Sequence, residues 1–184
     1  MDNPADRLYI LFQLALGVDG RDRAFTRIWN AYGKRIHFYV SRIISGDAGH
    51  HDDCFQEVML KIYEGLDGYR IDRPLKPWLF RVARNCCLDF LKKRTEEAAE
   101  NIELVPAAPD RAPEERLICG ELFGAVGESI DALSADDAQL AYLRFFEGMR
   151  FSEIAKIMEM NENTVKTRMT AIKKKLRHEL KEWL

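Results

Sequence analysis

The spacing of apolar residues limits what this chain can fold into more than any other feature of its sequence. Apolar residues recur at steps of three and four, and no segment alternates apolar with polar residues. The clearest stripe, within residues 23–45, consists of Phe25, Ile28, Trp29, Tyr32, Ile36, Tyr39, Val40 and Ile43. This period lays one apolar face along a helix, whereas a half-buried strand needs a period of two. The sequence therefore predicts an all-α protein.

Breaks in this pattern divide the chain into two helical parts. Residues 95–113 lack helical periodicity and are rich in Ala, Glu and Pro, a composition typical of a linker. Beyond it, Ser134 is placed to cap a helix, with Asp137 three residues on. A chain of 184 residues has room for two small domains. We therefore predict a small helical domain over residues 1–94, a flexible linker over 95–113 and a second helical domain over 114–184.

The net charge of −2 hides two strongly basic segments. Residues 76–94 and 164–184 each carry a net charge of +5, so the remainder of the chain carries −12. Two compact basic segments in an acidic protein favour two contacts with a polyanion. A solvated helix face is the simpler explanation for either segment taken alone.

The second basic segment lies in the clearest motif, a short helix, a turn and a longer basic helix within residues 151–180. Ser152 and Asn161 are placed to cap the two helices. At its start, the longer helix presents Asn163, Lys166, Thr167 and Thr170 opposite an apolar stripe. Such amide, ammonium and hydroxyl groups suit base edges and phosphates in a major groove, as in a helix-turn-helix. The alternative is a helical hairpin with a charged outer face.

The first basic segment mixes cations with aromatic residues. Its predicted outward face holds Arg81, Arg84, Asn85 and Leu88, and the preceding loop adds Tyr69, Arg70 and Arg73. Cations beside an exposed aromatic ring suit single-stranded DNA, because bases stack on the ring while the cations hold the backbone. For Trp78, packing in the core is the favoured interpretation, whereas Tyr69 is less clearly committed to a core.

A polar helix face between residues 53 and 61 is a candidate protein-docking surface. Asp53, Gln56, Glu57 and Lys61 share one side of the predicted helix. By itself this pattern is explained equally well by a solvated face, which we take as the simpler interpretation.

Three motifs in order give the chain a recognisable pattern. They are Asp53-x-x-Gln56-Glu57-Val58, the run from Pro77 to Asn85, and Thr164-Val165-Lys166-Thr167-Arg168 after a Pro-bearing linker. From about residue 24 to residue 180 the chain resembles an extracytoplasmic-function (ECF) sigma factor of the sigma-70 family. The resemblance implies sigma region 2 in the first domain and sigma region 4, with its helix-turn-helix, in the second.

The resemblance also implies a function and site residues. The function is a sigma factor that binds core RNA polymerase and directs promoter-specific transcription initiation. Asp53, Gln56 and Glu57 would dock on the beta-prime clamp helices, which replaces the solvated interpretation of that face. The residues for the melted −10 element would be Tyr69, Arg70, Arg73, Lys76, Arg81, Arg84 and Asn85. The residues for the −35 element would be Asn163, Lys166, Thr167, Arg168 and Lys173.

The implied partners are core RNA polymerase, through its beta-prime clamp helices and beta flap, promoter DNA and an anti-sigma factor. One departure limits the analogy, because family members often carry a basic residue where this chain has Ala171 and a bulkier one at Thr170. The −35 sequence therefore does not transfer by analogy. The alternative function is a conventional helix-turn-helix regulator that binds duplex operator DNA without polymerase, which leaves the first basic segment unexplained.

Other classes of protein fit the sequence less well. The sequence contains no phosphate-binding Gly-rich loop, nucleophile elbow or HExxH motif, so we predict no catalytic residue and no cofactor. A metal cluster of His50, His51, Asp53 and Cys54 is less economical than incidental histidines at a helix start, and we predict no metal. With no apolar run of the ~20 residues that a span requires and no signal peptide, we expect a cytoplasmic protein without membrane insertion.

The four cysteines, Cys54, Cys86, Cys87 and Cys119, form no CxxC pair. In a cytosolic chain they are most simply reduced core residues. A redox role stays open at this point.

Overall fold

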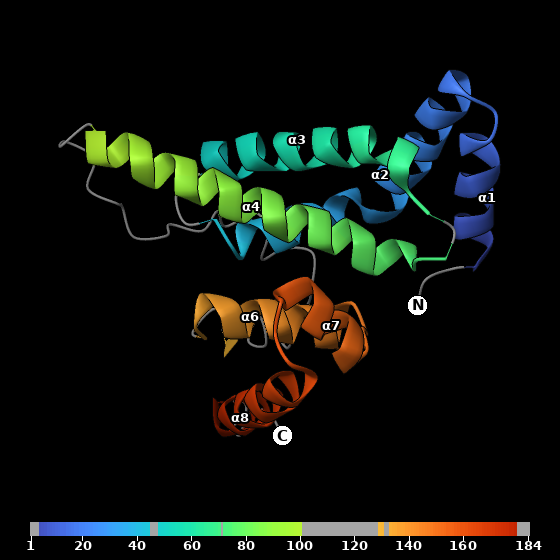
Figure 1. Cartoon of the computed structure of the whole chain (residues 1–184). Coiled ribbons are helices and arrows are strands. Elements are labelled where there is room, and N and C mark those ends of the chain that lie inside the picture. Colours follow the sequence, from blue (N-terminus) through green and yellow to red (C-terminus); the bar gives the residue numbers. More distant parts are fainter. Residues whose placement is uncertain (1–3, 45–47, 71, 101–128, 131–132, 180–184) are drawn as a thin grey trace. The chain divides into compact units, whose positions relative to one another are not determined.

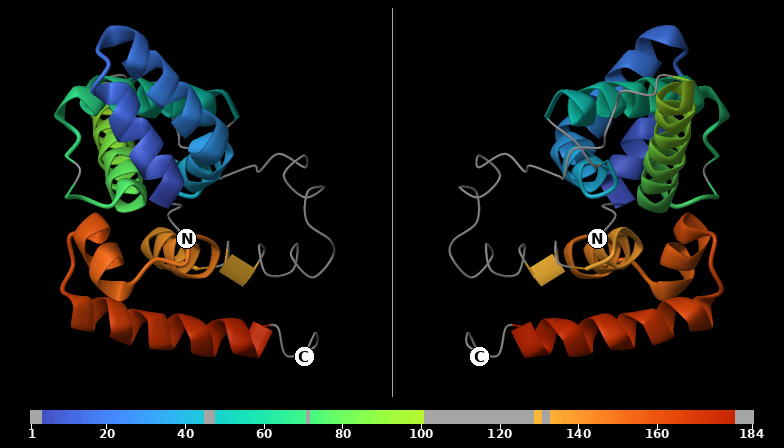
Figure 2. Two further views of the ribbon diagram at one scale, coloured as in Figure 1. Left: turned by 90° about the vertical axis from the view of Figure 1, so that its right-hand side faces the viewer. Right: turned by 90° about the vertical axis from the view of Figure 1, so that its left-hand side faces the viewer.

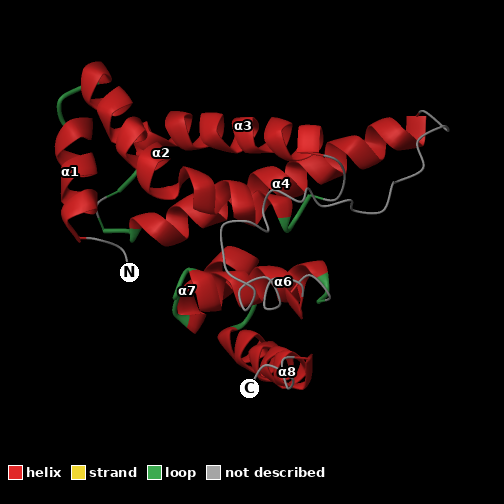
Figure 3. Ribbon diagram, turned by 180° about the vertical axis from the view of Figure 1, so that it is seen from behind, coloured by secondary structure: helices red, strands yellow, loops and turns green. Residues whose placement is uncertain are grey.

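The computed structural model describes residues 4–44, 48–70, 72–100, 129–130 and 133–179. Every regular element among them is helical, as the colouring of Figure 3 shows, so the prediction of an all-α fold is confirmed. The chain divides into two compact units, residues 1–107 and 108–184.

The described helical elements of the first unit are, in order, α1 (Pro4–Leu14), α2 (Val18–Ser41), α3 (Ala48–Gly65), the short 3₁₀ turn η1 (Leu66–Gly68) and α4 (Leu75–Glu100). This unit thus contains α2 and α4, the two longest of the described helices (Figure 1). Helix α4 thus continues past Arg94, where we predicted the linker to begin. Most of the predicted linker, the start of the second domain and Cys119 lie outside the described residues, so our domain boundaries stay a prediction.

Helices α2, α3 and α4 enclose the core of the first unit. Ile28, Ile36, Val58, Ile62 and Leu79 are completely buried, and the first two belong to the apolar stripe predicted within residues 23–45. The rings of Tyr39 and Phe80 meet edge to face with centroids 5.2 Å apart. This core fixes which sides of α3 and α4 remain free.

Helix α1 packs closely against α2, and Figure 2 shows the two side by side. The chain turns between them at Gly17, whose φ of 85° favours glycine. At Gly20 a Cβ atom would lie 1.7 Å from the carbonyl oxygen of Gln13, so the approach of the two helices requires glycine there.

Among the described residues of the second unit there are four helical elements. They are α6 (Ala135–Ala141), the π-helical turn η3 (Tyr142–Phe146), α7 (Phe151–Met158) and α8 (Glu162–Glu179). The Ser134 hydroxyl accepts a bond of 3.3 Å from the amide of Asp137, which caps α6 as predicted.

Helices α7 and α8 form the predicted helix-turn-helix. The side chain of Asn161 accepts a bond of 2.8 Å from the Asn163 amide and so caps α8, as predicted. The prediction for Ser152 was wrong: α7 begins at Phe151 with Arg150 at the capping position, and the carboxylate of Glu153 accepts a bond of 2.8 Å from the Arg150 amide. Between the helices, Glu159 adopts a left-handed conformation with φ of 54°, which ends α7.

Candidate nucleic-acid and protein-docking surfaces

The outward side of α3 carries the residues predicted to dock a protein. Asp53 and Gln56 are exposed and Glu57 is half-buried. Leu60, on the next turn, is 55% exposed although it is an apolar residue within a well-packed unit. Helical geometry puts Leu60 between Gln56 and Glu64 on this side. We call Asp53, Gln56, Glu57, Leu60 and Glu64 the α3 face.

Leu60 was missing from the sequence prediction. The predicted docking face consisted of the polar residues Asp53, Gln56, Glu57 and Lys61, and it left out the leucine that falls between polar positions. A helical wheel of residues 52–64 would have found it, because Leu60 follows Gln56 and Asp53 by about one and two turns. The exposed side chain of Leu60 offers apolar area that a partner protein can cover, with the acids and the amide around it as a polar rim.

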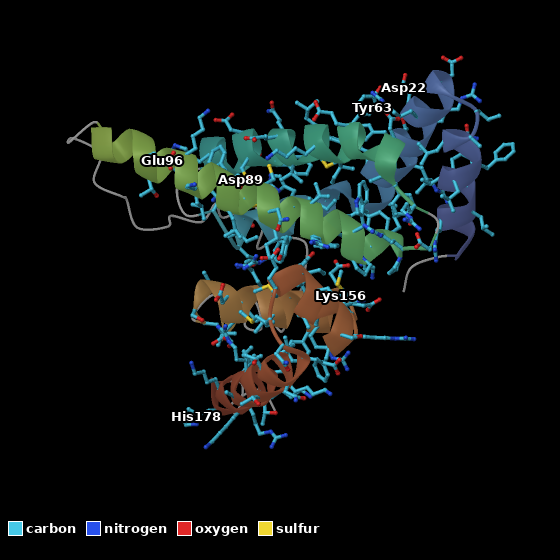
Figure 4. All side chains as sticks on the ribbon, in the orientation of Figure 1. Asp22, Tyr63, Asp89, Glu96, Lys156 and His178 are labelled. Atoms are coloured by element: carbon cyan, nitrogen blue, oxygen red, sulfur yellow. The ribbon has the colours of Figure 1, made fainter. Side chains whose placement is uncertain are left out.

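Both edges of α3 are fixed by contacts with neighbouring helices. On the α4 side, Lys61 lies 3.3 Å from Asp89 and 3.5 Å from Glu57, so this predicted surface cation is held in ion pairs. On the α2 side, Tyr63 of α3 contacts Asp22 of α2. Figure 4 labels these two residues and Asp89 on α4. The Tyr63 hydroxyl donates to the Asp22 carboxylate over 2.7 Å. These contacts hold the α3 face in a fixed orientation.

Aromatic rings add to the α2 side of this packing. The ring of Phe55 lies between Trp29 and His37, at centroid distances of 5.6 and 5.0 Å. His37 also contacts the Asp52 carboxylate at 2.9 Å. Residues one position away from the α3 face therefore anchor the helix, while Glu57 within the face pairs with Lys61 of the same helix.

Three cysteine thiols lie behind the α3 face, in the interface of α3 with α4. Cys54, Cys86 and Cys87 are buried and reduced, and the sulfur atoms of Cys54 and Cys87 are 3.6 Å apart. Contact with Cys86 lowers the pKa of Cys54, but the bond to Cys87 and burial together raise that pKa to about 12. The bond to Cys54 and burial raise the pKa of Cys86.

Because the thiolate is the reactive form, we expect these thiols to be inert in the folded chain. In a Cys119→Ser variant at pH 8, a small alkylating reagent should label the folded protein at least about 100-fold more slowly than the urea-unfolded protein. Mass spectrometry of the labelled peptides measures this ratio. Rapid labelling of Cys54 or Cys86 without unfolding would show that the thiols are accessible, and would reopen a redox role.

The residues predicted to contact the −10 element separate into exposed and buried groups. Arg70, Arg73, Arg81 and Asn85 are exposed, whereas Lys76 and Arg84 are buried. On α4, Arg81, Asn85, Leu88 and Lys92 are exposed at steps of three and four and so lie along one side. We call these four residues the α4 face.

Tyr69 is tied into its own loop. Its side chain is buried, its hydroxyl donates a bond of 2.7 Å to the Arg73 carbonyl, and its ring packs on Trp78 at 5.1 Å. The favoured interpretation of Trp78 as a packing residue agrees with this contact. The hydrogen bond from Tyr69 to Arg73 joins the two ends of this loop, and the side chains of Arg70 and Arg73 are exposed at its surface.

On α8, Asn163, Lys166, Thr167 and Lys173 are all exposed, as a recognition helix requires. Lys166 pairs with Glu162 over 2.7 Å. This contact accounts for an acid at the start of a basic helix, where the positive end of the helix dipole also favours a carboxylate. Arg168 differs from the other four predicted residues, because it is only half-exposed and contacts Asp136 and Asp137 of α6.

Within the described part of the chain, no three side chains of His, Cys, Asp or Glu are placed to hold a metal ion. The histidine cluster considered from the sequence does not converge, because His51 bonds to the Ile44 carbonyl at 3.0 Å while Cys54 faces the core and Asp53 faces outward. None of the described helices has the length and apolar character needed to span a membrane.

Two family models match the chain, one in each unit. Sigma-70 region 2 matches residues 28–97, which include the α3 and α4 faces, and Sigma-70 region 4 matches residues 123–176, which include the helix-turn-helix. The ECF RNA polymerase sigma-E factor of Escherichia coli (strain K12) is 30% identical over 161 residues, which cover 82% of this chain and 83% of that protein. The RNA polymerase sigma-H factor of Pseudomonas aeruginosa is 31% identical over 160 residues, covering 82% of both.

Two solved structures share the fold. The sigma factor RpoE from Bartonella quintana, solved with the anti-sigma factor NepR, aligns with a TM-score of 0.71 at 20% identity, over 85% of this chain and 96% of that one. CnrH, solved with the cytosolic domain of CnrY, aligns with a TM-score of 0.62 at 21% identity, over 97% and 98% of the two chains.

Proposed function

Because this chain belongs to the ECF group of the sigma-70 family, we propose that three of its exposed surfaces perform separate steps of transcription initiation. They are the α3 face, the α4 face with its adjoining loop, and helix α8. As a sigma factor, the chain binds core RNA polymerase and directs it to specific promoters. The alternative of a conventional helix-turn-helix regulator is not favoured, because it provides no use for a region 2. The proposal concerns which residues perform each step.

The α3 face docks on the beta-prime clamp helices of the polymerase. The observation that supports this assignment is Leu60, 55% exposed among Asp53, Gln56 and Glu57. An apolar centre surrounded by polar groups gains stability from excluding water, while the rim supplies hydrogen bonds and specificity. The fixed edges of α3 mean that little ordering cost is added on binding.

Removing the polar part of this face should weaken docking. We expect the double substitution Gln56→Ala and Glu57→Ala to reduce affinity for core polymerase by about tenfold, because each lost interface hydrogen bond costs about 0.5–1.5 kcal/mol. Equilibrium binding of the labelled chain to purified core polymerase measures the effect. Glu96→Ala, which removes an exposed acid of α4, is the control and should bind as the wild type does. Unchanged affinity of the double variant would refute the docking assignment.

The α4 face and the adjoining loop hold the melted −10 strand. Arg81 and Asn85 lie on the exposed side of α4, and Arg70 and Arg73 extend the positive charge along the loop. Cations at this spacing follow a sugar-phosphate backbone, and an amide can recognise an unpaired base. Tyr69 shapes the loop through its bond to the Arg73 carbonyl, and the buried Lys76 and Arg84 add positive potential behind the surface.

Helix α8 reads the −35 element in duplex DNA. Asn163 and Thr167 are exposed on its first turns, where groove-reading side chains reach base edges. Lys166 and Lys173 contact phosphates, which add affinity without sequence preference. The second unit also meets the beta flap of the polymerase, as the family resemblance implies.

An anti-sigma factor is a further partner in this proposal. The two structural neighbours were each solved with a partner, named as an anti-sigma factor in one case. Such a partner would silence this chain most simply by covering the α3 face. We further propose that the chain acts in the cytoplasm, together with the polymerase, and contributes no catalytic residue of its own.

Run-off transcription from a library of genomic fragments tests the function as a whole. Core polymerase is assayed with and without the chain, and we expect new transcripts that start downstream of a shared two-part motif. If the chain added no start sites and did not bind core polymerase, but shifted duplex DNA alone, the conventional regulator would replace the sigma factor.

A further inference from the structure

We propose that Arg168 positions the recognition helix α8 from within the second unit and does not contact DNA. The proposal rests on the function proposed above for α8, the reading of the −35 element. It removes from the predicted DNA-binding set a residue that the motif Thr164–Arg168 would otherwise place beside Lys166.

The guanidinium of Arg168 is held by two carboxylates at the start of α6. Its Nε donates to Asp137 Oδ1 over 2.8 Å, and Nη2 lies 2.8 Å from the same oxygen. Its Nη1 donates to Asp136 Oδ2 over 3.4 Å and lies 3.8 Å from the sulfur of Met160. Arg168 therefore joins three pieces of the fold, namely α6, the turn before α8 and α8 itself.

The acids that hold Arg168 are themselves fixed. Asp137 is the third residue of α6, and its amide bonds to the capping hydroxyl of Ser134 at 3.3 Å. The positive end of the α6 dipole favours carboxylates in this first turn. The side chain of Asp137 is only 18% exposed and that of Arg168 30%, so water screens the pair less than it would a surface ion pair. Arg168 thus holds α8 against a rigid anchor.

The charges at this site also oppose a contact with DNA. Two carboxylates lie within 3.4 Å of one guanidinium, so the cluster carries a net negative charge. A phosphate approaching Arg168 would be repelled by both acids.

Lys166 and Arg168 lie about 200° apart around the helix, so they occupy different flanks of α8. Lys166, with a side chain 50% exposed and one acid partner, is therefore a natural comparison.

The substitution Asp137→Asn distinguishes positioning from DNA contact by the sign of its effect. If Arg168 positions α8, the loss of the ion pair should weaken −35 binding about 3- to 30-fold, as Arg168→Ala should. If Arg168 contacts DNA, removing a repulsive carboxylate should leave binding unchanged or strengthen it. The assay measures the affinity of holoenzyme, reconstituted from core polymerase and the full chain, for a promoter found by the run-off screen. The affinity for the same promoter with a scrambled −35 element is the reference.

Salt dependence supplies a second readout. For Arg168→Ala and Asp137→Asn we expect the slope of log affinity against log salt concentration to match the wild type. Lys166→Ala should instead reduce the magnitude of this slope by about 0.9, the value for one phosphate contact. A comparable loss of slope in Arg168→Ala, or tighter binding by Asp137→Asn, would overturn the inference.

Urea unfolding of the full chain tests the positioning contact without DNA. Arg168→Ala and Asp137→Ala should each lower the unfolding midpoint of the second unit, and the double variant should fall no further than the single ones, because both remove the same contact. Additive shifts would overturn the inference. If wild-type holoenzyme bound promoters with an intact and a scrambled −35 element equally well, the function proposed for α8 would be overturned instead. The urea result would still decide whether Arg168 and Asp137 stabilise the second unit through their contact.

Discussion

Leu60→Glu should reduce the affinity of this chain for core RNA polymerase by about 100-fold or more. The side chain is 55% exposed in the free chain, so the substitution leaves the fold intact. In the docked state the same position would be dry, and an unpaired carboxylate there costs several kcal/mol. Each 1.4 kcal/mol is a factor of ten in affinity. Equilibrium binding to core polymerase and run-off transcription should fall together.

The chain offers a matched control in Leu88→Glu. Leu88 is 41% exposed, belongs to the same unit and lies on the α4 face instead of the α3 face. We expect Leu88→Glu to retain core affinity within about twofold and to lose promoter opening, because it places a negative charge where the DNA strand would lie. If both variants lost core affinity equally, the effect would reflect damage to the unit and not a docking surface.

The sequence predicted those features that depend on local periodicity. The stripe that begins at Phe25 predicted most of α2, which starts earlier, at Val18, and ends at Ser41. The apolar spacing after Asn161 predicted α8, since a helix places residues three and four apart on one face. Capping by Ser134 and Asn161 was also predictable, because a cap bonds an amide two or three residues away.

Features that depend on distant contacts were not predictable in this way. Arg168 meets Asp137 across 31 residues of sequence, and no local pattern indicates that its charge is already neutralised. Tyr69 appeared as available for stacking as any loop aromatic, until its bond to the Arg73 carbonyl and its contact with Trp78 were seen. In both cases composition identified a basic or aromatic segment, and only packing showed which side chains remain free.

The double substitution Arg81→Ala and Asn85→Ala should reduce run-off transcription from a linear duplex promoter by about 10- to 100-fold while core affinity stays unchanged. Both side chains are exposed one turn apart on α4, away from the α3 face. The expected size follows from the loss of one phosphate contact and one base contact, worth about 1.4–2.8 kcal/mol together, since each 1.4 kcal/mol is a factor of ten. Permanganate footprinting of unpaired thymines on the same promoter measures opening directly.

A promoter with a mismatched −10 bubble separates the two roles that this face can have. If Arg81 and Asn85 drive strand separation, the bubble supplies the opening and the double variant should recover most of its activity. If they hold the displaced strand, the bubble should leave the defect in place, because the unpaired bases still lack their contacts. Lys34→Ala, which removes an exposed cation of α2, should transcribe normally from both templates. Equal losses for Lys34→Ala would mean that general positive charge, and not the α4 face, supports opening.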